Sequence, residues 1–189
     1  MADAPEQELD EDGLVVQKYH SQVLVVMPPE GFGDQTLRYA RSSLYNVHVG
    51  TLSVAPDAET EVKGRLQDVF LVDEALEGQT MDAFSGILVV ASEGANPLAD
   101  DARVLELVRA ADRDGKLVAT WGNGLAVLAR AGVVSGRKVT GAVACKEEAV
   151  AAGARFRGRE VVIDGHLVTA RDEGAGMRFG QALADQVRI

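Results

Sequence analysis

The sequence predicts a single α/β domain in which a mainly parallel sheet carries helices on both faces. Two observations predict this class. Continuous apolar runs rich in Val, Leu and Ala recur along the chain, as in strands that are buried on both faces. Segments with helical spacing of apolar residues alternate with these runs, which is the pattern of β-α-β units. At 189 residues and 47% hydrophobic, the chain is long enough for one sizeable core.

The strand predictions rest on short apolar runs bounded by glycine, proline or polar residues. Residues 60–72 look instead like a small hairpin or extended excursion, with Gly64 near its turn. Asp164–Gly165 is a hairpin-type dipeptide, which places a tight turn between the last two runs. The runs expected to form strands span residues 23–27, 47–54, 86–91, 116–121, 139–143, 161–163 and 167–170.

Four segments between or after these runs show helical spacing. The clearest spans residues 98–111, where apolar side chains recur on one stripe and Asp100 and Asp101 lie near the positive N-terminal end. A short apolar helix is expected over 125–131, ended by Gly132. The other two helices are expected over 34–45 and 175–187.

Acidic residues are concentrated at the start of the chain. Residues 1–13 hold six of the 29 acidic residues and no Lys or Arg. Because so charged and apolar-poor a segment buries little surface, we predict a disordered acidic tail over 1–13, followed by one domain over 14–189. Leu14–Val16 is a candidate extra edge strand or arm. The acids of the tail are Asp3, Glu6, Glu8, Asp10, Glu11 and Asp12.

Composition excludes several function classes. A formal net charge of −10 without a basic, aromatic-interleaved stripe argues against nucleic acid as a partner. The apolar runs are too short to span a membrane, and the acidic start differs from a secretory signal, so we expect a cytoplasmic protein. A single cysteine, Cys145, excludes an intramolecular disulfide, and three scattered histidines lack metal-ligand spacing. We expect no metal and no cofactor.

Residues 116–136 combine a strand, a sharp turn and a helix. In open α/β sheets such a turn lifts one side chain over the carboxyl edge, where chemistry needs a nucleophile such as Ser or Cys. Trp121 stands at that place, and an indole has no nucleophilic atom at neutral pH. Gly122 and Gly124 follow; they serve either the tight turn alone or direct contact between backbone and ligand.

Four segments in order resemble the ThiJ/PfpI family of the class I glutamine-amidotransferase-like superfamily. KLVATWGNGLAVLARAGVVSGRKVT resembles its nucleophile-elbow segment, and PPEGFGDQTL its first strand-to-helix turn. GILVVASEGANPL resembles the strand and loop that supply an oxyanion-hole amide, and VVIDGHLVTARDEGAGMRFGQALADQV the family's ending. The resemblance implies a flavodoxin-like three-layer sandwich and a homodimer.

The departures from the family pattern decide the functional expectation. The resemblance places the cysteine at Trp121, the pocket glutamate at Thr36 and a pocket histidine at Ala142, so thiolate, carboxylate and imidazole are all missing there. Arg171 matches an arginine at the pocket rim, which binds an anion or merely pairs with Asp172 or Glu173. The remaining pocket positions that the resemblance gives are Gly122, Glu93 and Gly94. We therefore assign no catalytic residue.

The sequence favours a divergent family member without cysteine-dependent hydrolase or glyoxalase activity, a pseudoenzyme that acts as a binding, regulatory or stress-related protein. One alternative is an enzyme of glyoxalase, amidase or peptidase type that uses a remodelled site, with Cys145 as its only thiol. Cys145 begins a candidate helix, where a thiol pKa can be lowered, but it also fits a small, partly buried residue. A third alternative is a small-molecule receptor in which Trp121 stacks on the ligand.

Overall fold

A computed structural model describes residues 8–9, 15–16, 19–57, 61–66 and 68–187 of the chain. Within them, seven strands form one sheet in the order β13-β14-β10-β9-β3-β5-β8. Neighbours in this sheet are parallel, except that β13 and β14 are antiparallel. The strands are β3 (Ser21–Val26), β5 (Val49–Ala55), β8 (Glu74–Ala75), β9 (Gly86–Val89), β10 (Leu117–Trp121), β13 (Val161–Asp164) and β14 (Leu167–Ala170).

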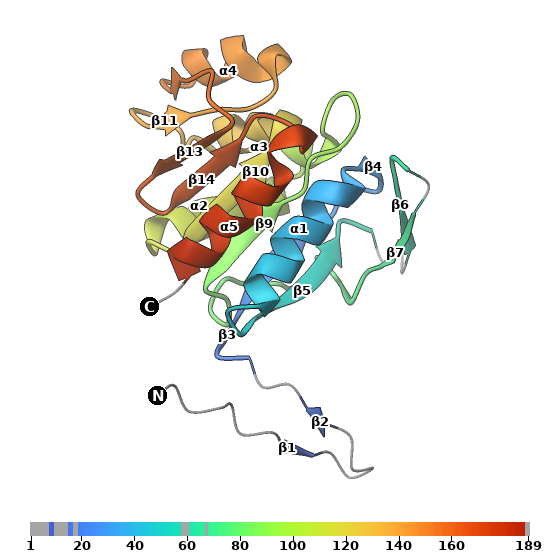
Figure 1. The fold of residues 1–189 in the computed structure, drawn as a ribbon. Helices are drawn as coiled ribbons and strands as arrows, with labels where there is room; N and C mark the ends of the chain where they lie inside the picture. The colour runs from blue at the N-terminus through green and yellow to red at the C-terminus, as the bar shows by residue number, and fades with distance from the viewer. Residues whose placement is uncertain (1–7, 10–14, 17–18, 58–60, 67, 188–189) are drawn as a thin grey trace.

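Helices cover both faces of this sheet. Helices α1 (Asp34–Tyr45) and α5 (Gly176–Val187) lie side by side on one face, and α2 (Ala102–Arg113) and α3 (Leu125–Ala131) lie on the other (Figure 1). A short helix, α4 (Lys146–Ala151), packs against α3. The predicted three-layer α/β class is confirmed. Four 3-10 turns complete the helical elements: η1 (Pro97–Asp100), η2 (Gly122–Gly124), η3 (Val143–Cys145) and η4 (Glu173–Ala175).

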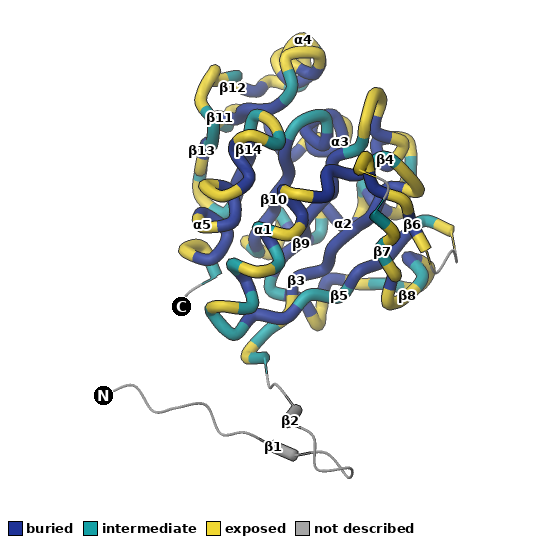
Figure 2. The backbone as a smooth tube through the Cα atoms, turned by 45° about the vertical axis from the view of Figure 1, so that its right-hand side comes forward, coloured by how far each residue is buried: buried dark blue, intermediate teal, exposed yellow. Residues whose placement is uncertain are grey.

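The central strands are buried on both faces, which explains why they read as continuous apolar runs. In β3, Val23 and Val25 point into the cluster beneath α1 and α5, whereas Leu24 and Val26 point into the cluster beneath α2 and α3. All four side chains are fully buried. The middle of the sheet is accordingly dark blue in Figure 2. Successive side chains of a strand thus serve two different cores.

Two smaller sheets flank the main one, and one strand prediction needs correction. The excursion predicted over 60–72 is present as β6 (Glu61–Gly64) and β7 (Val69–Leu71), which join β4 (Glu30–Phe32). The strand predicted over 139–143 is wrong beyond its first residue, because only Lys138–Val139 forms a strand, β11, paired with β12 (Arg155–Phe156). The Ala142 amide instead donates to the Gly122 carbonyl oxygen at 2.9 Å, which turns the chain toward the main sheet's edge.

The amino-terminal arm is only partly described. β1 (Glu8–Leu9) pairs antiparallel with β2 (Val15–Val16), apart from the seven-stranded sheet (Figure 1). The rest of the predicted tail lies outside the described residues. Among the helices of the described chain, none combines the length and apolar character needed to cross a membrane.

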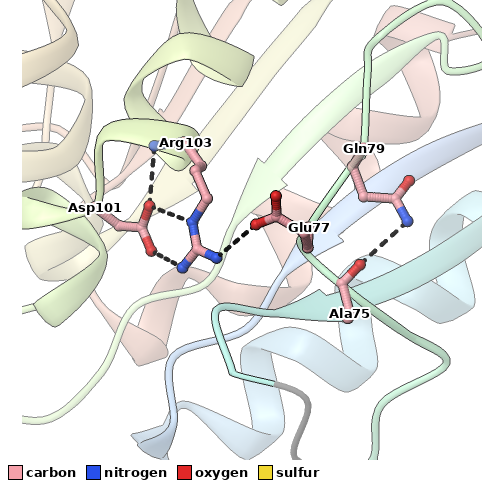
Figure 3. Close-up of polar contacts among 5 residues, drawn as sticks. All are labelled: Ala75, Glu77, Gln79, Asp101 and Arg103. Carbon is pink, nitrogen blue, oxygen red and sulfur yellow. Dashed lines mark hydrogen bonds and ion pairs between the residues drawn. The ribbon is translucent and has the colours of Figure 1, made fainter.

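The helix predicted over 98–111 is divided at Asp101. This residue has extended backbone angles, φ −87° and ψ 110°, and its carboxylate accepts a hydrogen bond from the Arg103 amide at 2.9 Å. Asp101 is therefore the N-cap of α2, and η1 precedes it as a separate turn. Figure 3 shows the Arg103 guanidinium bridging Asp101 and Glu77, while Gln79 donates to the Ala75 carbonyl oxygen nearby. These contacts join the start of α2 to the segment that follows β8.

Candidate functional site

A hollow of about 600 Å³ lies where the parallel strands β9, β10 and β14 end. Open α/β sheets bind their ligands at this carboxyl edge, and the volume lies within the range of small-molecule sites. Segments far apart in the sequence meet there because parallel strands end on the same side. The lining residues are Gly31, Gly33, Arg65, Ala91, Ser92, Glu93, Gly94, Trp121, Gly122, Asn123, Ala142, Val143, Ala144, Arg171, Asp172 and Glu173.

The bend between β10 and the following helix falls at Gly122. Trp121 is still extended, with φ −135° and ψ 167°, whereas Gly122 has a φ of +55°. A nucleophile elbow carries its reactive residue on just such a strained strand-to-helix turn. The prediction that Trp121 stands at the tip of the bend is therefore wrong, because Gly122 does. A Cβ atom at Gly122 would meet only the Ala91 Cβ, at 3.6 Å, so the bend has room for a side chain and lacks one.

Trp121 forms part of the wall of the hollow. Its side chain is only 1% exposed and packs edge-to-face on Phe179 of α5, with ring centroids 5.7 Å apart. The indole Nε1 donates a hydrogen bond to Glu173 Oε1 at 2.5 Å. Both contacts hold the ring toward the face of the sheet that α1 and α5 cover.

Glu173 supplies a carboxylate that the sequence analysis did not place in the site. Its Oε2 accepts a hydrogen bond from the Thr36 amide at 3.1 Å. That amide belongs to the first turn of α1, where backbone donors lack intrahelical partners, and the N-cap residue Gly33 offers no side chain. Glu173 therefore caps α1 from η4. A Cβ on Gly33 would lie 1.7 Å from Glu173 Oε1, so the arrangement depends on that glycine.

Asn123 fixes the loop that follows β9. Its Oδ1 accepts from the Ser92 amide at 3.1 Å, and its Nδ2 donates to the Ser92 carbonyl oxygen at 2.6 Å and to that of Gly94. The next amide, of Glu93, donates to the Gly31 carbonyl oxygen at 2.8 Å. Two successive amides of the loop expected to supply an oxyanion-hole donor are thus already engaged.

Six of the seven predicted pocket positions line the hollow, namely Glu93, Gly94, Trp121, Gly122, Ala142 and Arg171. Thr36 does not line it; it is fully buried behind the Glu173 carboxylate. Arg171 pairs with Asp172 at 2.7 Å, which is one of the two roles considered for it. Within the described residues, no group of three His, Cys, Asp or Glu side chains is arranged to hold a metal ion.

Cys145 lies outside the lining. It is 7% exposed and belongs to the apolar cluster beneath α2 and α3, with its Sγ 3.8 Å from the Asn123 carbonyl oxygen. Burial raises the pKa of this thiol above its ordinary value, and the charge of Glu148 raises it further. Of the two alternatives for Cys145, the small buried residue is confirmed. A pKa lowered by the helix start is contradicted, because desolvation dominates.

Comparison with known proteins agrees with this arrangement. The family model described as the DJ-1/PfpI family matches residues 21–186. The chain belongs to the DJ-1/PfpI family. It is 28% identical over 164 residues to the uncharacterized protein MJ0967 of Methanocaldococcus jannaschii, covering 85% of this chain and 80% of the relative. It is 25% identical to the protein named deglycase TK1284 of Thermococcus kodakarensis, covering 80% of this chain and 90% of the relative.

Solved structures of DJ-1/PfpI proteins share the fold. Drosophila melanogaster DJ-1beta matches with a TM-score of 0.80 and 24% identity, over 88% of this chain and 90% of its own. The ThiJ/PfpI domain protein from Brachyspira murdochii matches with a TM-score of 0.83 and 22% identity, over 90% and 97% of the two chains. The flavodoxin-like, three-layer DJ-1/PfpI fold expected from the resemblance is confirmed.

Proposed function

We propose that this chain is a DJ-1/PfpI protein without cysteine-dependent chemistry, which binds a small molecule at the carboxyl edge of its sheet in a regulatory or stress-related role. The observation that carries the proposal is Gly122 at the strand-to-helix bend. The position from which an elbow presents its nucleophile has no side chain, and the chain's one thiol, Cys145, is buried outside the hollow. A covalent step through sulfur has no starting atom there.

Two further observations support the proposal. The Glu173 carboxylate is engaged by Trp121 and by the amide of Thr36, so it holds a wall and a helix end together. Ala142 lines the hollow at the position where the family resemblance expects an imidazole, and a methyl group transfers no proton. The hollow itself is open and walled by an aromatic ring, which suits binding.

Turnover assays test the absence of cysteine chemistry. The purified chain is incubated with methylglyoxal and with a methylglyoxal-glycated amine, and product is measured for the wild type and for Cys145→Ala. We expect both proteins to give the rate of the protein-free control. Turnover that disappears in Cys145→Ala would overturn the proposal and favour a thiol enzyme.

The specific alternative is an enzyme that uses the remodelled site without a thiol. It is favoured by the relatives named deglycases and by the presence of a carboxylate, Glu173, in the lining. In that case turnover would survive Cys145→Ala and fall in Glu173→Gln. The same assay, extended to Glu173→Gln, therefore separates the two functions.

Ligand binding has its own readout. Trp121 is the chain's single tryptophan and borders the hollow, so a molecule bound there changes the surroundings of the only indole in the chain. We expect at least one member of a metabolite panel to change the emission saturably, and Val143→Glu, at an exposed lining position, to weaken the response. A flat response across the panel would count against a ligand site.

We also propose a cytoplasmic homodimer, as the family resemblance implies. Exposed apolar side chains support association, because Leu66, Val69 and Leu71 at the β6–β7 hairpin are 65%, 55% and 68% exposed. Analytical ultracentrifugation tests the dimer. Sedimentation as a monomer at every protein concentration would contradict the proposed dimer.

A further inference from the structure

Another hollow, of about 530 Å³, lies away from the carboxyl ends of the strands, beside the edge strand β13. It is lined by Lys138, residues 157–159 and residues 161–163. β13 is the last strand in the sheet order, and within the described chain it pairs only with β14. No strand pairs with its outer edge in the described chain, and β11 packs beside that edge and supplies Lys138 to the hollow. Unpaired backbone groups of an edge strand can bind an extended segment.

The cations of this hollow have no acidic partner. The side chains of Lys138, Arg157 and Arg159 make no ion pair or hydrogen bond within the described part of the chain, although several other arginines of the molecule do. Two acids lie close in sequence. Glu160 pairs with Arg178 at 2.7 Å, away from these cations. The Asp164 carboxylate lies beside the hollow, where it accepts from the Lys138 backbone amide at 2.7 Å but forms no ion pair with a cation of the described chain. In a chain of net charge −10, three cations without an ion pair among the described residues, gathered around one hollow, give it a local positive charge that attracts an anionic group.

The chain carries a segment of matching chemistry. Residues 1–13 hold six carboxylates and no Lys or Arg, the densest acidic stretch of the sequence. The two described residues of that segment form β1, which is drawn away from the seven-stranded sheet (Figure 1). From the unpaired cations, the free strand edge and this charge complementarity, we propose that the hollow beside β13 binds the acidic amino-terminal segment, residues 1–13.

The contact joins carboxylates of the segment to Lys138, Arg157 and Arg159, and Ile163, 46% exposed, gives the floor an apolar surface. Arginine binds carboxylates with two parallel hydrogen bonds, whereas Lys138 acts as a point charge. Because the site is exposed and charged, its affinity falls as salt rises. The segment is an intramolecular ligand, so any other anion must compete with it for the hollow.

Zero-length cross-linking of the full chain tests the proposal directly. A carbodiimide joins a carboxylate to a lysine amine only when the two touch, and mass spectrometry identifies the joined peptides. We expect peptides from residues 1–13 joined to Lys138 several-fold more often than to Lys146, which is also exposed and makes no side-chain ion pair with the residues that the structure describes. Equal yields at Lys138 and Lys146 would overturn the proposal.

A binding assay with matched charge reversals gives the second test. A labelled peptide with the sequence of residues 1–13 is titrated with full-length protein in which the six acids of that segment are replaced by Asn or Gln. Adding Arg157→Glu and Arg159→Glu should weaken binding about tenfold or more. Lys63→Glu with Lys146→Glu is the control, because both lysines are exposed, lie outside both hollows and make no side-chain ion pair within the described chain. It should change binding less than about twofold.

Inorganic phosphate separates the segment from a small anion. It is titrated against the same protein with the labelled peptide as reporter. Displacement of bound peptide at high phosphate supports a shared site. Phosphate binding that Arg157→Glu with Arg159→Glu abolishes, together with no binding of the peptide, would assign the hollow to small phosphate ligands and overturn the proposal.

Discussion

At the scale of single residues, the chemistry open to the site depends on which residue occupies the bend after β10. Gly122 adopts the left-handed conformation and Trp121 is the buried end of the strand. In a Cys145→Ala background, we expect Gly122→Cys to fold at a cost of about 1–2 kcal/mol for the left-handed backbone. We expect Trp121→Cys to cost about 3–5 kcal/mol, because it removes a large buried ring.

Thiol reactivity distinguishes the two variants. In the folded protein, a thiol at position 122 lines the open hollow and should react quickly with Ellman's reagent, whereas one at 121 should react only on unfolding. Cys145→Ala alone, which has no thiol, gives the baseline. Faster reaction of the thiol at 121 than of that at 122 would show that the bend has been assigned to the wrong residue.

Glu173 should stabilise the fold more than an exposed acid does. Glu173→Ala leaves the Trp121 Nε1 and the Thr36 amide without their acceptor, for an expected loss of about 1–3 kcal/mol. The loss is measured by urea unfolding followed by circular dichroism. Asp172→Ala is the control, because its exposed pair with Arg171 contributes less than about 1 kcal/mol. Equal losses for the two variants would contradict a capping role for Glu173.

The site can be predicted from the sequence except in two respects: the bend lies at Gly122 and not at Trp121, and Glu173 belongs to the lining. Strand ends predict the sheet's carboxyl edge, so most of the lining was expected. The backbone angles that make Gly122 the bend residue are a three-dimensional property, and the letters WGNG alone allow either assignment. Glu173 could have been found, because it follows the strand at 167–170 whose end meets the same edge. The hydrogen bond that Glu173 accepts from the Thr36 amide, 137 residues away in sequence, could not have been predicted.

At the scale of elements, the start of α2 gives a pH-dependent prediction. Hydrogen bonding to Arg103 holds the pKa of Asp101 below its ordinary value. A lowered pKa in the folded state contributes stability above the unfolded pKa, near 4, and this contribution is lost as pH falls through the folded pKa. Asp101→Ala should therefore cost about 1 kcal/mol near neutral pH, and the gap to wild type should narrow in acid.

Melting temperature against pH checks this prediction, with Asp101→Asn as the control. Asn caps a helix about as well as Asp and carries no charge, so this variant should keep most of the neutral-pH stability. It should also lack the part of the wild-type stability that is lost when the Asp101 carboxylate is protonated. A gap between wild type and Asp101→Ala that stays constant down to about pH 2 would show that the Arg103 contact adds nothing to stability.

The packing of α1 against α5 depends on a glycine in α5. A Cβ at Gly180 would lie 2.7 Å from the Tyr39 carbonyl oxygen and 2.6 Å from Ser43 Oγ, so Gly180→Ala must push the helices apart. We expect a loss of about 1–3 kcal/mol in urea unfolding. Alanine is otherwise a better helix former than glycine, so a gain in stability would mean that the contact between α1 and α5 has room for the methyl group. Gln181→Ala, exposed on the same helix, should be nearly neutral.

Strands could be predicted from the sequence where burial on both faces of the sheet makes every residue of the run apolar. Residues 23–26 of β3, 87–89 of β9 and 117–119 of β10 are all apolar, because each of their side chains enters one of two cores. The stretch 139–143 is also predicted as a strand, yet it contributes only Val139 to one, because Ala142 and Val143 turn to line the hollow. Val143 is 78% exposed there, so an apolar side chain in the sequence need not belong to a buried strand.

At the scale of the whole molecule, the two apolar clusters share one sheet. Strands β3, β5, β9, β10 and β14 each contribute side chains to both clusters. We expect neither cluster to unfold while the other keeps these strands in place. The division of the chain into one domain after the amino-terminal segment remains a prediction. The structure offers an internal reporter for each cluster: Trp121 belongs to the one beneath α1 and α5, and Cys145 to the one beneath α2 and α3.

We therefore expect a single cooperative unfolding transition. Tryptophan fluorescence, the reactivity of the Cys145 thiol and far-ultraviolet circular dichroism should give the same urea midpoint and the same slope. Chemical labelling of the thiol must be brief compared with unfolding, so that it reports the equilibrium population. A thiol that becomes reactive at a lower urea concentration than the one that shifts the tryptophan emission would show that the α2–α3 face unfolds first. In that case the sheet would not couple its two faces, and the chain after the amino-terminal segment would unfold as two units.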